Sequence, residues 1–74
     1  MSPGEWWVLC RTVERYGFKP ERQSEPWAAA LEAGRYVERR AGTLYPTAKG
    51  SWYYATRWTM FYRRHAVAQV GLFE

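Results

Sequence analysis

The residues of this chain that could support covalent or acid–base chemistry are few and scattered. Cys10 is the single cysteine and His65 the single histidine, so a Cys10–His65 dyad is the one nucleophilic pairing that the sequence allows. No third group to orient the histidine and no oxyanion motif accompanies it. The seven acidic residues are all glutamates that stand singly among arginines, which is typical of solvated surface charge rather than of a catalytic carboxylate pair. The sequence predicts no enzymatic activity.

A metal or cofactor site is not predicted either. The sequence has no cluster of residues with metal-ligand spacing and no glycine-rich phosphate loop. Cys10 lies between Leu9 and Val13 on an apolar helical stripe, where a reduced thiol behaves as a small hydrophobic group. We therefore expect a protein without cofactors that acts by binding.

The charged residues point to an anionic partner. Lysine and arginine together number 11 against 7 acidic residues, which gives a net charge of +4. Most of these cations are arginines, which make paired contacts to phosphate and to guanine edges that lysine cannot copy. The alternative is that a GC-rich genome encodes arginine in preference to lysine, in which case the excess says nothing about partners.

Length and hydropathy give an expectation for domain count and location. At 74 residues the chain is expected to form one domain, residues 1–74, with a small core. Met1–Glu5 lacks the basic start and apolar run of a signal peptide, and no segment approaches the ~20 apolar residues needed to cross a bilayer. We expect a cytoplasmic protein that does not enter the membrane.

Three helices are predicted to position the charged residues. The first covers Glu5–Tyr16, where apolar residues follow helical spacing and Gly17 is a natural stop. The second runs from a cap at Ser24 to Gly34. The third begins at about Thr47 and continues beyond residue 60. Trp7 lies off the apolar stripe of the first helix and needs another partner.

Between the second and third helices the sequence predicts a basic β-hairpin. Residues 36–40 and 43–45 are rich in β-type residues, and Ala41-Gly42 offers a tight reversal between them. Arg39 and Arg40 flank this turn, so their side chains can project from the hairpin tip into a groove or onto phosphates. The hairpin register stays open, because the length of the loop cannot be read from the sequence.

Residues 31–50 carry a series of residue types in a familiar order. The series is a leucine, a glycine, an apolar pair, two arginines, a short turn, and a threonine shortly before lysine-glycine: Leu31, Gly34, Tyr36-Val37, Arg39-Arg40, Ala41-Gly42 and Thr47-Ala48-Lys49-Gly50. This segment resembles the second half of a winged helix-turn-helix DNA-binding domain, as found in MarR- and PadR-type regulators. The resemblance implies a small α+β, winged-helix-like domain in the order helix, helix, β-hairpin, long helix.

The chain departs from that family pattern between its first two helices. A standard domain has a complete short helix before the recognition helix, whereas here only Phe18–Gln23 is available, enough for a single turn. Ala28–Ala30 of the second helix also lacks the polar side chains with which a recognition helix reads bases. The β-hairpin corresponds to the wing of this family. Contact with DNA through this wing is therefore better supported than insertion of the second helix into a DNA groove.

The first functional prediction is binding to double-stranded DNA, by a small transcriptional regulator of bacteria or their phages. The wing arginines, the front of the second helix and the base of the wing would supply the contacts. The predicted DNA-binding residues are Arg22, Gln23, Ser24, Arg35, Arg39, Arg40 and Lys49. The alternative for the wing is a charged edge that only discourages strand pairing with other molecules.

The second functional prediction comes from 14 aromatic residues, more than so small a domain can bury. Tryptophan, tyrosine and arginine are the types most often found as interface hot spots. The predicted protein-interface residues of the third helix are Trp52, Tyr54, Trp58, Phe61 and Tyr62. The alternative function is thus a non-enzymatic protein-binding module, such as a phage-type inhibitor of a larger complex. A homodimer formed through this helix also stays open.

Overall fold

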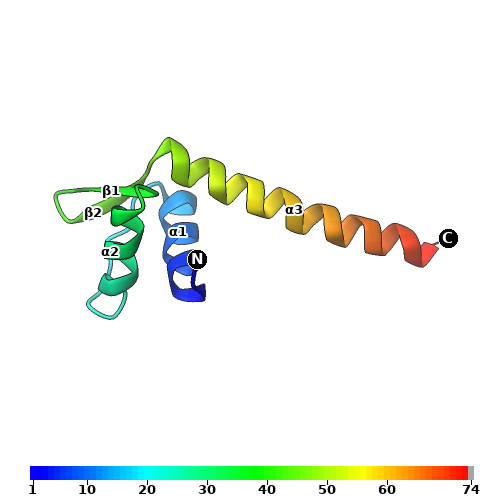
Figure 1. The fold of residues 1–74 in the computed structure, drawn as a ribbon, viewed down its shortest axis with the longest axis horizontal. Coiled ribbons are helices and arrows are strands. Elements are labelled where there is room, and N and C mark those ends of the chain that lie inside the picture. Colours follow the sequence, from blue (N-terminus) through cyan, green and yellow to red (C-terminus); the bar gives the residue numbers. More distant parts are fainter. Residues whose placement is uncertain (74) are drawn as a thin grey trace.

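Three helices and one β-hairpin follow one another in the computed structural model, in the order helix, helix, hairpin, helix (Figure 1). The structure describes the backbone of residues 1–73 and the side chains of residues 1–60. The elements are α1 (Pro3–Arg15), α2 (Glu25–Ala33), β1 (Val37–Arg40), β2 (Thr43–Pro46) and α3 (Ala48–Phe73). The predicted α+β class and the predicted order of elements are confirmed.

Helix α1 begins two residues earlier than the sequence predicted, because Ser2 caps it. The Ser2 hydroxyl accepts a hydrogen bond from the Glu5 backbone N–H at 3.3 Å, and Pro3 occupies the first turn. The helix ends at Tyr16, which itself adopts the left-handed conformation with φ of 49°. The predicted stop at Gly17 is therefore displaced by one residue.

The core is formed by one or two small apolar side chains from each of four elements. The buried residues are Val8 and Leu9 of α1, Ala28 and Leu31 of α2, Val37 of β1 and Leu44 of β2. Aromatic rings lie around this core as partly buried neighbours rather than inside it. The core is thus too small to cover all the aromatic surface of the chain.

The hairpin closes at Ala41-Gly42, as predicted. Both residues have positive φ, 52° and 80°, as a two-residue type I′ turn requires. The register pairs Arg40 with Thr43 and Arg39 with Leu44. On its other edge β2 pairs with Phe18, whose backbone exchanges hydrogen bonds of 2.9 and 2.8 Å with Leu44. Residues from the linker between α1 and α2 therefore extend the sheet.

Helix α3 starts against the hairpin and then leaves the rest of the molecule (Figure 1). Thr47 caps it, since the Thr47 hydroxyl accepts a hydrogen bond from the Gly50 N–H at 3.1 Å. Gly50 is buried against the backbone carbonyl of Tyr36, where a side-chain carbon would overlap the oxygen. With 26 residues the helix is about 39 Å long and gives the molecule extents of 52 × 23 × 19 Å.

Candidate functional site

The segment before α2 forms a turn and not a helix. Residues 22–24 make this turn, so the structure has no complete helix between α1 and α2 among the residues that it describes. Arg22 and Gln23 are exposed on it. Ser24 occupies the cap position of α2 but is buried, and its side chain makes no capping hydrogen bond. Of these three predicted DNA-binding residues, only Arg22 and Gln23 present their side chains at the surface.

Arg39 is turned back onto α2 and away from the hairpin tip. Its guanidinium lies 2.5 Å from a carboxylate oxygen of Glu25 and 2.6 Å from one of Glu32, and its side chain is only 27% exposed. The Nε–H donates a further hydrogen bond to Glu32 at 2.9 Å. The hydrogen bond to Glu25 raises the pKa of Arg39 above its usual value, with burial opposing the shift and the hydrogen bond to Glu32 adding to it. This guanidinium is committed to the two carboxylates of α2.

The direction of Arg39 follows from the alternation of side chains along β1. Val37 is buried, and residues two apart in a strand share a face, so Arg39 must lie on the inner side. Glu38 and Arg40 share the outer face and form an ion pair of 3.2 Å. Period-2 alternation from Val37 was the sequence signal that could have separated the two arginines.

Arg40 remains at the hairpin tip, on the outer face. Its side chain is 63% exposed, and its guanidinium lies 4.3 Å from the centre of the Tyr45 ring. An exposed cation stacked on a ring is held in place and still accessible to a phosphate. The projection that the sequence predicted for both wing arginines therefore applies to Arg40 alone.

Arg35 and Lys49 lie together where α2, the hairpin and α3 meet. The Arg35 carbonyl accepts a hydrogen bond of 2.6 Å from the Thr47 hydroxyl, and the Arg35 side chain is exposed. The Lys49 ammonium donates to the Gly34 carbonyl at 2.8 Å and lies 4.5 Å from the centre of the Tyr36 ring. Lys49 thus caps the carboxyl end of α2 and retains two further N–H donors.

The aromatic residues predicted as an interface on α3 have different environments. Trp52 is 68% exposed, and Trp58 lies at the surface as well. Tyr54 is half-buried, because its ring stacks on Trp6 with 5.8 Å between centroids, and burial raises the pKa of its hydroxyl. The predicted residues Phe61 and Tyr62 lie outside the described side chains.

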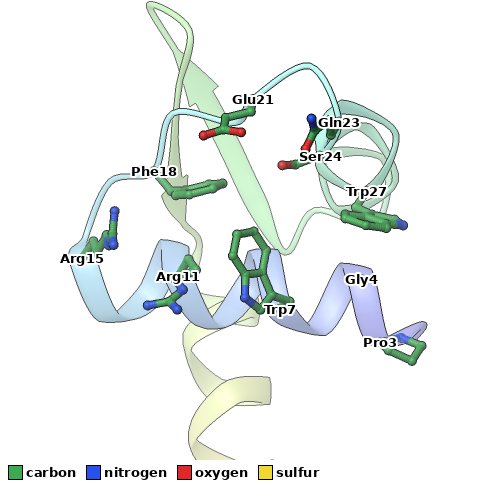
Figure 2. Close-up of a pocket in the computed structure, with 10 residues that line it drawn as sticks. All are labelled: Pro3, Gly4, Trp7, Arg11, Arg15, Phe18, Glu21, Gln23, Ser24 and Trp27. Atoms are coloured by element: carbon green, nitrogen blue, oxygen red, sulfur yellow. The ribbon is translucent and has the colours of Figure 1, made fainter.

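A groove between α1 and α2 was not foreseen from the sequence. It has a volume of about 720 Å³, and Figure 2 shows aromatic side chains from both helices and from the linker around it. Trp7 of α1 is 45% exposed there and Trp27 of α2 is 40% exposed. Arg11 and Arg15 continue the same side of α1. The position of Trp7 off the apolar stripe of the first helix was the only sequence signal for it.

The described part of the chain shows no group of three potential ligands placed to hold a metal ion. Cys10 is half-buried, and desolvation, followed by the nearby charge of Glu14, raises the pKa of its thiol. His65, the one histidine that could pair with Cys10, has its side chain outside the described residues. Within the described residues, no helix combines the length and the apolar character needed to cross a membrane.

Comparison with known protein families, with curated proteins and with solved structures found no significant match.

Proposed function

We propose that this protein binds duplex DNA through a cationic surface around α2, which we define as Arg22, Arg35, Arg40 and Lys49. Arg22 precedes α2, Arg35 follows it, and Arg40 and Lys49 belong to the hairpin and to α3. The nine residues of α2 span about 14 Å, close to the ~12 Å width of the major groove. Cations at the two ends of such a helix are spaced to contact the phosphates that border the two sides of one groove.

The observation that carries this proposal is the double ion pair of Arg39. Glu25 and Glu32 would otherwise place two negative charges on α2 and repel phosphates. Arg39 cancels one of these two negative charges, and Arg22 and Arg35 add two positive charges at the ends of the helix, so these five side chains carry a net charge of +1. No hydrogen bond or ion pair engages the side chain of Arg22 or of Arg35 within the described part of the chain.

The outward face of α2 suggests weak reading of the base sequence. Ala29, Ala30 and Ala33 are exposed on it and offer no hydrogen-bonding groups to base edges. Alanine methyl groups can contact thymine methyl groups, which gives limited discrimination. We therefore propose that Arg39 and the buried Ser24 stabilise the fold of this surface. The four cations of the surface contact phosphates.

A pair of double variants tests the proposal. Arg22→Gln with Arg35→Gln removes two cations from the proposed surface, and Arg11→Gln with Arg15→Gln removes two from α1. Fluorescence anisotropy with a labelled duplex should show that the Arg22→Gln, Arg35→Gln variant binds DNA about tenfold or more weaker, whereas the Arg11→Gln, Arg15→Gln variant binds nearly as well as the wild type. Both double variants should be equally stable. Equal loss of affinity in the two double variants would contradict the assignment to α2, and absence of DNA binding at low salt would refute the function.

The second candidate function is capture of a protein, including a second copy of this chain, through α3. The exposed side chains of Trp52 and Met60 favour it, since they line a shallow pocket of about 360 Å³ on that helix. Light scattering together with size-exclusion chromatography distinguishes a homodimer from a monomer. If α3 forms the dimer, Trp52→Ala should shift the protein to the monomer, whereas Trp7→Ala should leave the dimer intact.

A further inference from the structure

The groove between α1 and α2 has the character of an unfilled binding surface. Its apolar part consists of Trp7, Phe18 and Trp27, with Trp7 and Phe18 edge to face at 5.8 Å. Trp7 and Trp27 both line this groove, and each leaves some two-fifths of its surface exposed, although aromatic rings gain much from burial. This apolar surface is open to solvent between the two helices.

The rim of the groove is positively charged at one end. Trp7, Arg11 and Arg15 are four residues apart and form one ridge of α1, about 12 Å long. Figure 2 shows the two arginines beyond Trp7 along this ridge, at the end of the groove away from Trp27. Glu21 is the one acidic residue among the described residues that line the groove. The groove therefore offers an aromatic end and a cationic end.

The aromatic end is held in a fixed shape by α1 itself. The indole of Trp27 packs so closely on Gly4 that a side-chain carbon at this position would overlap the ring. The guanidinium of Arg11 lies 5.4 Å from the centre of the Trp7 ring. A surface whose rings are already positioned loses little conformational entropy when a partner binds.

The chain between α1 and α2 borders the groove without forming a helix over it. Phe18 is bound to β2 by backbone hydrogen bonds, and residues 22–24 form a turn. The groove of about 720 Å³ between α1 and α2 is therefore open along the linker side of both helices.

We infer that this groove binds an acidic amphipathic helix of a partner protein. Apolar side chains of that helix pack between Trp7 and Trp27, and its carboxylates face Arg11 and Arg15, which lie about one and two turns further along α1. The third helix of a second copy fits less well, because Arg57, Arg63 and Arg64 would bring positive charge to a positive rim. The inference concerns a surface separate from the proposed DNA contacts.

The probe for this inference is a capped helical peptide of about four turns, with leucines in one half of a face and glutamates in the other half. A matched peptide carries lysines in place of the glutamates. In ¹⁵N NMR spectra of the full chain, the acidic peptide should shift the indole N–H signals of Trp7 and Trp27 and leave that of Trp52 in place. The lysine peptide should bind at least about tenfold more weakly.

A charge-reversed variant makes the test independent of folding defects. Arg11→Glu with Arg15→Glu changes two exposed side chains and should reverse the preference, so that the lysine peptide binds better than the acidic one. Arg40→Glu is the matched control on the hairpin and should keep the original preference. Trp27→Ala should weaken binding of the acidic peptide by about tenfold or more, with thermal unfolding measured on each variant.

Three results would overturn the inference. The first is that the acidic peptide at millimolar concentration leaves both indole signals unshifted. The second is that the charge-reversed variant keeps the original preference. The third is that duplex DNA shifts the Trp7 and Trp27 signals and displaces the peptide, which would make the groove a nucleic-acid site.

Discussion

At the scale of single residues, identical side chains in neighbouring positions perform different tasks. Arg39 binds two carboxylates on α2, whereas Arg40 is exposed at the hairpin tip. Arg39→Met keeps the length of the side chain and removes its charge, so we expect the free energy of unfolding in urea to fall by about 1 kcal/mol. Arg40→Met is the matched control and should change it by less than about 0.5 kcal/mol. Equal stability of the two variants would contradict the structural role of Arg39.

Cys10 gives a second prediction at the residue scale, which concerns pH. Burial raises the pKa of the folded thiol above that of the unfolded chain, which is about 8.5. The folded state then holds this proton more tightly, so the contribution of Cys10 to stability is full below the unfolded pKa and is lost as the pH rises through the folded pKa. Urea unfolding should show the stability of the wild type, relative to Cys10→Ala, decreasing from pH 8 to above pH 10. A relative gain over that range would contradict the raised pKa.

At the scale of secondary-structure elements, the junction between the hairpin and α3 depends on Gly50. Alanine normally stabilises a helix relative to glycine by about 1 kcal/mol. Here the added carbon would meet the Tyr36 carbonyl, which is backbone and cannot swing aside. Gly50→Ala should therefore destabilise the protein by about 1 to 3 kcal/mol in thermal or urea unfolding. Ser51→Ala, an exposed change in the same turn, should have little effect, and a stabilised Gly50→Ala would show that the contact is looser.

At the scale of the whole molecule, charge and shape lead to a prediction about DNA recognition. The four phosphate contacts that we propose around α2 imply that the logarithm of the binding constant falls with the logarithm of the salt concentration at a slope of about −3.6. A fourfold rise in salt should then weaken binding about a hundredfold, by similar amounts for duplexes of unrelated sequence. Anisotropy titrations over a salt series measure both quantities. A slope near zero, or strong preference for one sequence, would contradict binding through phosphates and an alanine-rich helix face.

The sequence alone determined the elements and their order, because these depend on local features of the chain. The two positive-φ residues Ala41 and Gly42 close the hairpin where the sequence placed the turn, and Thr47 caps α3 as predicted. Caps, turns and helical periodicity act over a few neighbouring residues, so they can be read without knowing the fold.

Only the tertiary structure decided which partners most of the predicted site residues contact. The carboxylates that bind Arg39 are 14 and 7 positions earlier in the chain, and Lys49 caps a helix that ended 16 positions before it. The groove likewise needs α1 and α2 to be packed, since Trp7 and Trp27 face it from different helices. Such contacts join residues distant in sequence, and their partners are chosen by strand register and helix packing, which no local pattern specifies.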